Sequence, residues 1–66
     1  MKIYAAYDSA GHRVQVIDAK SDDLAAVRAA LEYFANKGPL NLPVTINDGA
    51  GPGKTYTVER PNDQEA

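Results

Sequence analysis

The sequence predicts a single small α+β domain with the element order ββαββ, in which one helix packs on one face of an antiparallel sheet. Three observations lead to this prediction. Apolar residues recur at helical spacing in one central segment, the segments on both sides of it alternate polar and apolar residues, and 66 residues suffice for one domain. The domain is expected to span residues 1–60. Residues 61–66 are polar and are expected to form a disordered C-terminal tail.

Two strands are predicted at the N-terminus, over residues 2–8 and 13–19. The short turn between them contains Gly11 and implies an antiparallel hairpin. In the first strand the side chains expected to face the core are Ile3, Ala5 and Tyr7. The opposite face then carries Tyr4 and Ala6. In the second strand Val14 and Val16 are expected to face the core, and the outward residues are Arg13, Gln15 and Ile17.

A helix is predicted to follow, with Ser21 as its N-cap and carboxylates in its first turn, where they favour the positive end of the helix dipole. Gly38 and Pro39 are expected to end it. The apolar residues that share the core-facing arc are Leu24, Val27, Leu31, Phe34 and Ala35. The outward face is expected to present Ala26, Ala29 and Tyr33.

Two further strands are predicted after the helix. Leu40, Leu42, Val44 and Ile46 alternate with polar residues and Pro43, which indicates a third strand over residues 40–47. Because Pro43 cannot donate a ladder hydrogen bond, it indicates either an edge strand or an unpaired strand start. Residues 54–60 are the predicted fourth strand, with Tyr56 and Val58 facing the core. The order of the strands does not follow from these patterns.

The stretch NDGAGPGKTYTV, residues 47–58, contains Gly53-Lys54-Thr55, the ending of a phosphate-binding loop. That motif requires a glycine five positions before Gly53, where this chain has Asp48. It also requires a helix next, so that the helix N-terminus faces the phosphates, whereas the following residues have a strand pattern. The sequence therefore predicts a hairpin connection and no nucleotide cofactor.

Asp8, Ser9 and His12 are the residue types of a catalytic triad, but they lie within one tight turn, which can hardly hold triad geometry. The single histidine and the absence of cysteine exclude multi-histidine and thiolate metal sites within one chain. Three carboxylates near the helix start, those of Asp18, Asp22 and Asp23, could hold a hard cation weakly. Capping and the helix dipole already explain Asp22 and Asp23. A chain this small also leaves little room for a deep ligand pocket. We expect no catalytic residue, no metal site and no cofactor, and therefore not an enzyme.

The charge balance is mildly acidic, with 7 basic and 9 acidic residues and a formal net charge of −2. The basic residues are scattered singly, which argues against a nucleic-acid partner without excluding one. No apolar stretch is long enough to cross a membrane. Because the chain has no cysteine and begins with a strand pattern in place of a signal peptide, a cytoplasmic location is expected.

Two surfaces are candidates for contact with a partner. On the uncovered sheet face, Tyr4, Arg13 and Ile17 combine residue types that are enriched at interface hot spots, although isolated apolar residues are also normal on protein surfaces. On the outer face of the helix, Tyr33 follows a smooth run of alanines. That face is either a docking ridge or only the composition of a good helix.

These observations favour a non-catalytic protein–protein interaction module that binds another protein or protein complex. In size and composition, though in no motif, the chain is similar to phage and mobile-element inhibitors of host defence, including anti-CRISPR proteins. That similarity implies steric blocking of a host complex. Two alternatives stay open: a small nucleic-acid-binding or regulatory domain, and a homo-oligomeric structural protein that pairs through an edge strand or the open sheet face.

Overall fold

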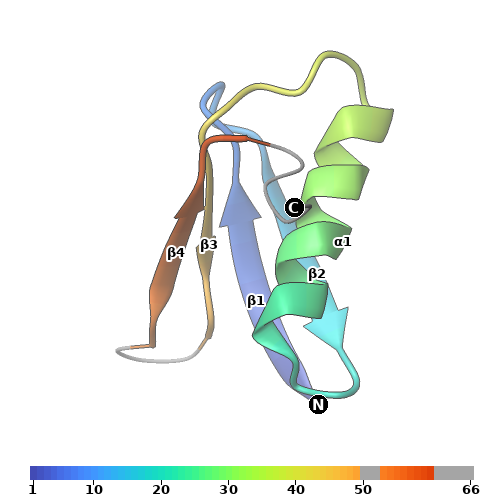
Figure 1. Ribbon diagram of the computed structural model, residues 1–66, viewed down its shortest axis with the longest axis vertical. Coiled ribbons are helices and arrows are strands. Elements are labelled where there is room, and N and C mark those ends of the chain that lie inside the picture. Colours follow the sequence, from blue (N-terminus) through green and yellow to red (C-terminus); the bar gives the residue numbers. More distant parts are fainter. Residues whose placement is uncertain (50–52, 61–66) are drawn as a thin grey trace.

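The computed structural model describes residues 1–49 and 53–60, and its element order is the predicted one (Figure 1). The elements are β1 (Lys2–Tyr7), β2 (Arg13–Asp18), α1 (Asp23–Asn36), β3 (Val44–Asn47) and β4 (Thr55–Val58). The four strands form one antiparallel sheet in the order β2-β1-β3-β4. The predicted α+β class is confirmed, while the predicted tail at 61–66 lies outside the described residues.

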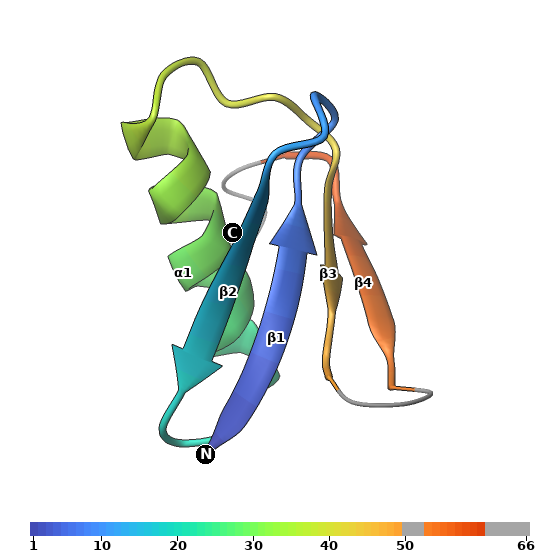
Figure 2. The same cartoon turned by 180° about the vertical axis from the view of Figure 1, so that it is seen from behind.

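The helix covers only one face of the sheet, where it contacts β2 and β3. Seen from behind, β2 crosses in front of the helix, β3 and β4 lie to the side of it, and no other described element covers the strands (Figure 2). The two hairpins, β1–β2 and β3–β4, meet through the pairing of β1 with β3. This meeting places the first strand of the chain in the middle of the sheet.

The predicted facing of β1 is wrong. Tyr4 and Ala6 are fully buried beneath the helix, whereas Ile3 and Tyr7 are 50% and 40% exposed. The reason is that β1 is apolar on both faces, so alternation alone does not choose between them. A tertiary contact distinguishes them: the buried hydroxyl of Tyr4 donates a hydrogen bond to Asp23.

The second strand has the predicted orientation. Val16 is buried and lies opposite Tyr4 in the pairing with β1. Arg13, Gln15 and Ile17 are exposed on the other face. Within this hairpin, the core-facing and outward residues of β2 are the predicted ones, whereas those of β1 are exchanged.

The helix begins with Asp22 as its N-cap, whose side chain accepts a hydrogen bond from the Leu24 amide at 3.1 Å. Ser21, the predicted cap, instead adopts a positive φ of 55° in the preceding turn. Asp18 organises the turn that contains Ser21 by accepting a hydrogen bond from the Lys20 amide at 2.9 Å. Asp22, the residue after this turn, is therefore the N-cap. Gly38, with a φ of 139°, follows the C-cap and ends the helix as predicted.

The face that the helix turns to the sheet differs in part from the predicted arc. The buried helical residues are Ala26, Ala30, Leu31 and Phe34. Ala26 was predicted to face outward and is 1% exposed, while Leu24 was predicted to be core and is 53% exposed; Ala35 is also exposed. The small side chains of Ala26 and Ala30 let the helix approach the sheet closely. A prediction that assigns the core face from the large apolar residues of a helix does not detect this effect.

The third strand is shorter than predicted, because it begins at Val44, directly after a cis Leu42–Pro43 peptide bond. It lies between β1 and β4, so Pro43 marks an unpaired strand start and not an edge strand. In β4, Val58 is buried and Tyr56 half-buried, as predicted. The core joins buried side chains from every element: Tyr4, Ala6, Val16, Ala26, Ala30, Leu31, Phe34, Val44, Ile46 and Val58.

Candidate functional site

The sheet face opposite the helix, called the open face below, is one candidate site. The strand residues that point to this side are Ile3, Ala5, Tyr7, Arg13, Gln15, Ile17, Thr45, Asn47, Thr55 and Thr57. Among these strand residues Arg13 carries the only charge. The β3 and β4 half is lined with threonine and asparagine, and the β1 and β2 half is apolar and aromatic.

Cross-strand pairing gathers the large side chains of the open face. Ile3 lies opposite Ile17, and Tyr7 lies opposite Arg13. Ile17 is 60% exposed, more than either Ile3 or Tyr7. The Arg13 guanidinium lies 5.9 Å from the centroid of the Tyr7 ring, within the range of a cation–π contact. An isoleucine pair and an arginine–tyrosine pair thus form neighbouring patches on one uncovered surface.

Only two of the four predicted partner residues lie on this face. Arg13 and Ile17 are there, but Tyr4 is 0% exposed on the opposite side and is excluded as a contact residue. Tyr33 is 41% exposed on α1, and its ring packs edge-on against Phe34 with centroids 5.6 Å apart. Sequence reasoning missed Ile3 and Tyr7, because the wrong facing of β1 assigned both to the core.

The hydroxyl of Tyr4 is part of a polar cluster that joins the sheet to the start of the helix. Tyr4 and Tyr56 each donate a hydrogen bond to a different oxygen of Asp23. The bond to Asp23 and burial raise the pKa of Tyr4, and the same two causes raise the pKa of Tyr56 to about 12. The two hydroxyls, and next the nearby Lys2, hold the pKa of Asp23 below its usual value. Asp23 therefore has a structural role that the capping argument did not anticipate.

The aspartates considered for cation binding are occupied by protein donors. Asp18 accepts bonds from two turn amides, those of Lys20 and Asp22, and Asp22 caps the helix. Lys2 Nζ lies 3.9 Å from Asp23 and 3.6 Å from Asp48. Within residues 1–49 and 53–60, no three metal-ligating side chains gather closely enough to hold an ion.

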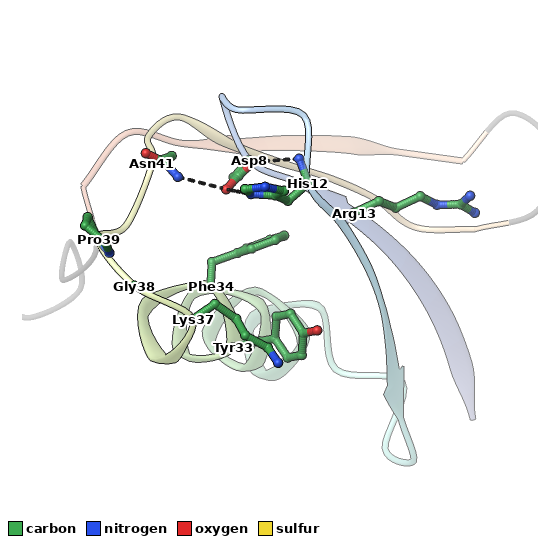
Figure 3. A pocket seen from close by; sticks show the side chains of 9 residues that line it. All are labelled: Asp8, His12, Arg13, Tyr33, Phe34, Lys37, Gly38, Pro39 and Asn41. Carbon is green, nitrogen blue, oxygen red and sulfur yellow. Dashed lines mark hydrogen bonds and ion pairs between the residues drawn. The ribbon is translucent and has the colours of Figure 1, made fainter.

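A second candidate site is a cavity of about 450 Å³ at the C-terminal end of α1 (Figure 3). This volume lies within the range of small-molecule sites, about 300–1,000 Å³, but the hollow is open to solvent and is not the deep pocket that the sequence argues against. Its lining comes from the β1–β2 turn, the end of the helix and the segment after it: Asp8, His12, Arg13, Tyr33, Phe34, Lys37, Gly38, Pro39 and Asn41. These residues fall in two stretches, 8–13 and 33–41, that are distant in the chain, so no local sequence pattern predicted the cavity.

Asp8 organises one wall of this cavity. Its Oδ1 accepts bonds from the amides of Ala10 and His12, at 3.1 and 2.8 Å. Its Oδ2 lies 3.3 Å from Asn41 Nδ2 and 3.2 Å from His12 Nδ1. Burial opposes ionisation of Asp8, but the bonds from His12 and Asn41 outweigh it and leave the pKa of Asp8 below its usual value. Asp8 and His12 thus meet as they would in a triad, yet two of the four contacts shape the turn itself.

No protein-family model, no curated protein and no solved structure matches this chain. In the described ranges, no helix is long and apolar enough to cross a membrane. The open face and the cavity are the two candidate sites of this chain in the residues that the structure describes.

Proposed function

We propose that the chain is a non-catalytic protein–protein interaction module that binds its partner through the open face. One observation carries the proposal: Ile3, Tyr7 and Ile17 are 50%, 40% and 60% exposed on a sheet face that no described element covers. Interface cores are enriched in aromatic residues and arginine and are poor in other charges. The open face has this composition, since Arg13, held over Tyr7, is its only charged strand residue.

The exposed isoleucines offer a favourable gain on binding. A fully buried isoleucine contributes roughly 1.5–3 kcal/mol relative to an exposed one. Because Ile3 and Ile17 each retain about half of their exposure, covering both would supply on the order of 2 kcal/mol. A partner that covers Tyr7 and Arg13 together would preserve their cation–π contact and exclude water from it. Such contacts are stronger when desolvated than when exposed to water, so this also favours binding.

The size of the open face favours a larger protein over a second copy of this chain. Its strands of four to six residues span roughly 300 Å², given about 3.3 Å per residue and 4.8 Å between strands. Two copies facing each other would bury about 600 Å² in total, below the roughly 1,200–2,000 Å² of stable interfaces. A larger partner could extend its contact beyond the strands to the turns around them.

In its most specific form, the proposal is that the protein is a phage or mobile-element inhibitor that sterically blocks a host defence complex of the CRISPR type. Small size, mild acidity and an apolar contact face support this form. The proposed location is the cytoplasm, in keeping with a chain without cysteine.

The test compares two variants that make the same chemical change at similar exposure. Ile17→Glu places a carboxylate in the open face, and Leu24→Glu places one on α1, where the side chain is 53% exposed. Each tagged variant and the unaltered chain are used to capture binding proteins from source-cell lysate, after circular dichroism establishes that each is folded. We expect one stoichiometric protein with the unaltered chain and with Leu24→Glu, and its loss with Ile17→Glu.

Other outcomes would overturn the proposal. Capture that Ile17→Glu leaves intact would exclude the open face as the contact surface. Capture of nucleic acid that moderate salt releases would favour the nucleic-acid-binding alternative, because phosphate contacts depend steeply on salt. A doubled mass of the purified chain, reversed by Ile17→Glu, would favour the homo-oligomer.

A further inference from the structure

We propose that the cavity at the C-terminal end of α1 binds a small, flat, apolar molecule that carries one carboxylate group. This inference is independent of the proposed protein-binding role, because the cavity lies at the end of the helix and Ile17 and Ile3 are not among its lining residues. The cavity has a volume of about 450 Å³, enough for a ring and a short polar substituent.

The apolar part of the cavity is aromatic. Phe34 reaches from the helix toward the His12 ring, and Tyr33 lies beside Lys37 on the helical side (Figure 3). Phe34 and Tyr33 are already in edge-to-face contact, with an interplanar angle of 87°. Pro39 closes one end of the same space. Aromatic and proline surfaces favour a planar apolar group, which can pack against them with ring centroids about 4.5–7 Å apart.

The carboxylate of Asp8 is unable to serve as the ligand's polar partner. Each carboxylate oxygen accepts about two hydrogen bonds, and both oxygens of Asp8 already have two partners within 3.3 Å. The side chain is also only 2% exposed. A cationic ligand would therefore find neither a free acceptor nor an accessible negative charge on this wall.

The positive charge of the cavity is more accessible. Lys37 is exposed at the rim of the cavity; its side chain runs away from the Asp8 wall toward Tyr33, and its ammonium lies 5.1 Å from the centroid of that ring (Figure 3). Among the described residues, no carboxylate lies within ion-pair distance of it. Arg13 adds a second positive charge nearby, although its guanidinium points away from the cavity (Figure 3).

Two effects act against an anion. Asp8 is ionised and lies in the same lining, although its four hydrogen-bond contacts offset part of its charge. The C-terminal end of a helix carries a partial negative charge of about half a unit. Here the last carbonyls are partly occupied: Phe34 O accepts the Lys37 amide at 3.2 Å, and Ala35 O accepts the Gly38 amide at 3.4 Å. Lys37 carries a full, exposed charge that no described carboxylate pairs with, whereas Asp8 is buried and its oxygens are bonded, so the proposed polar group of the ligand is a carboxylate.

The test is a titration followed by amide chemical shifts in NMR spectra. The probes are phenylacetate, the neutral phenylacetamide and the cationic benzylamine, which share a ring and differ in charge. For phenylacetate, with about ten non-hydrogen atoms, we expect a Kd on the order of 1–10 mM, with shifts confined to the lining segments. Phenylacetamide should bind several-fold more weakly and benzylamine more weakly still.

Two matched variants test the role of Lys37. Lys37→Gln should weaken phenylacetate binding roughly fivefold and leave phenylacetamide binding unchanged. Lys20→Gln, which removes an equal charge from an exposed residue outside the cavity, should change neither.

The proposal is overturned if benzylamine binds as tightly as phenylacetate, or if Lys37→Gln has no larger effect than Lys20→Gln. It is also overturned if phenylacetate produces no saturable shifts up to about 50 mM, well above the expected Kd. None of these results bears on capture through Ile17, so the two proposals succeed or fail separately.

Discussion

The assignment of the two sheet faces can be tested by the same substitution on each. Ile46 is 0% exposed on the helix-covered face, and Ile17 is 60% exposed on the open face. Isoleucine to valine removes one methylene and keeps the β-branch, so strand propensity is nearly unchanged. The difference between Ile46→Val and Ile17→Val then reports burial together with the position of the strand, central for β3 and edge for β2.

The expected magnitudes follow from these exposures. A buried methylene contributes about 0.8 kcal/mol, and the cavity left behind brings a typical Ile→Val cost to about 0.5–1.5 kcal/mol. We expect Ile46→Val to lower the free energy of unfolding by about 1 kcal/mol. Since Ile17 is less than half buried, its variant should lose about 0.3 kcal/mol. A domain of this size has a total stability of roughly 3–10 kcal/mol, so both variants stay folded.

The assay is urea denaturation followed by circular dichroism and by tyrosine fluorescence, whose coincidence tests two-state unfolding. With a slope of about 1 kcal/mol per molar, the midpoint should fall by about 1 M for Ile46→Val and by about 0.3 M for Ile17→Val. Equal shifts, or a larger shift for Ile17→Val, would refute the assignment of faces and with it the open face as a free surface.

Three further predictions concern the polar contacts. Asp23→Ala should lower the Tm by roughly 10 °C, since it leaves the buried Tyr4 hydroxyl without its acceptor. Adding Tyr4→Phe to Asp23→Ala should partly restore the Tm. If calorimetry shows that Asp23→Ala lowers the Tm equally with Tyr4 and with Phe at position 4, the coupling of the two residues is disproved. The folded chain holds the pKa of Asp8 and Asp23 below 3.8, their unfolded reference value. Their stabilisation is therefore complete above about pH 4 and is lost as pH falls through the lower folded values, so Asp23→Ala should flatten the acid limb of the stability curve, and an unchanged limb would contradict this. In Gly53→Ala the new Cβ would lie 1.8 Å from Asp48 Oδ1, forcing that side chain off the Lys54 amide; we expect a Tm about 5 °C lower by calorimetry, and an unchanged Tm would count against this contact.

The order of elements could be predicted because local signals agree with one another. Glycine and proline separate the segments, and periods of 2 and 3.6 residues distinguish the strands from the helix. In β2 Val14 and Val16 alternate with the polar Arg13 and Gln15, and although Ile17 is apolar the facing of this strand was predicted correctly. In β3 the alternation over Leu40 and Leu42 continues beyond the paired strand, so the predicted start was early.

The facing of β1 and the rotation of α1 could not be predicted, because each depends on contacts between distant residues. Tyr4 is buried with its hydroxyl satisfied by Asp23, and the two are 19 positions apart. Ala26 and Ala30 are buried because small residues let the helix approach the sheet, although larger apolar residues such as Leu24 were available. A pattern-based prediction favours large side chains and has no means of recognising either effect.

The candidate sites were predicted in the same uneven way. Arg13 and Ile17 were placed on the open face because β2 was oriented correctly. Ile3 and Tyr7 were missed together with the facing of β1, although they are the partners of Ile17 and Arg13 across the hairpin. The cavity had no signal in the sequence, because its walls come from two stretches, residues 8–13 and 33–41, that meet only in the folded chain.

Photo-crosslinking from the open face tests the central claim most directly. A benzophenone amino acid would replace Ile17 in one protein and Leu24 in another, two positions of similar exposure on β2 and α1. Both proteins would be irradiated in the cells from which the sequence derives. We expect a covalent adduct with one protein from position 17 and none from position 24. An adduct from position 24 alone, or from neither position, would contradict it.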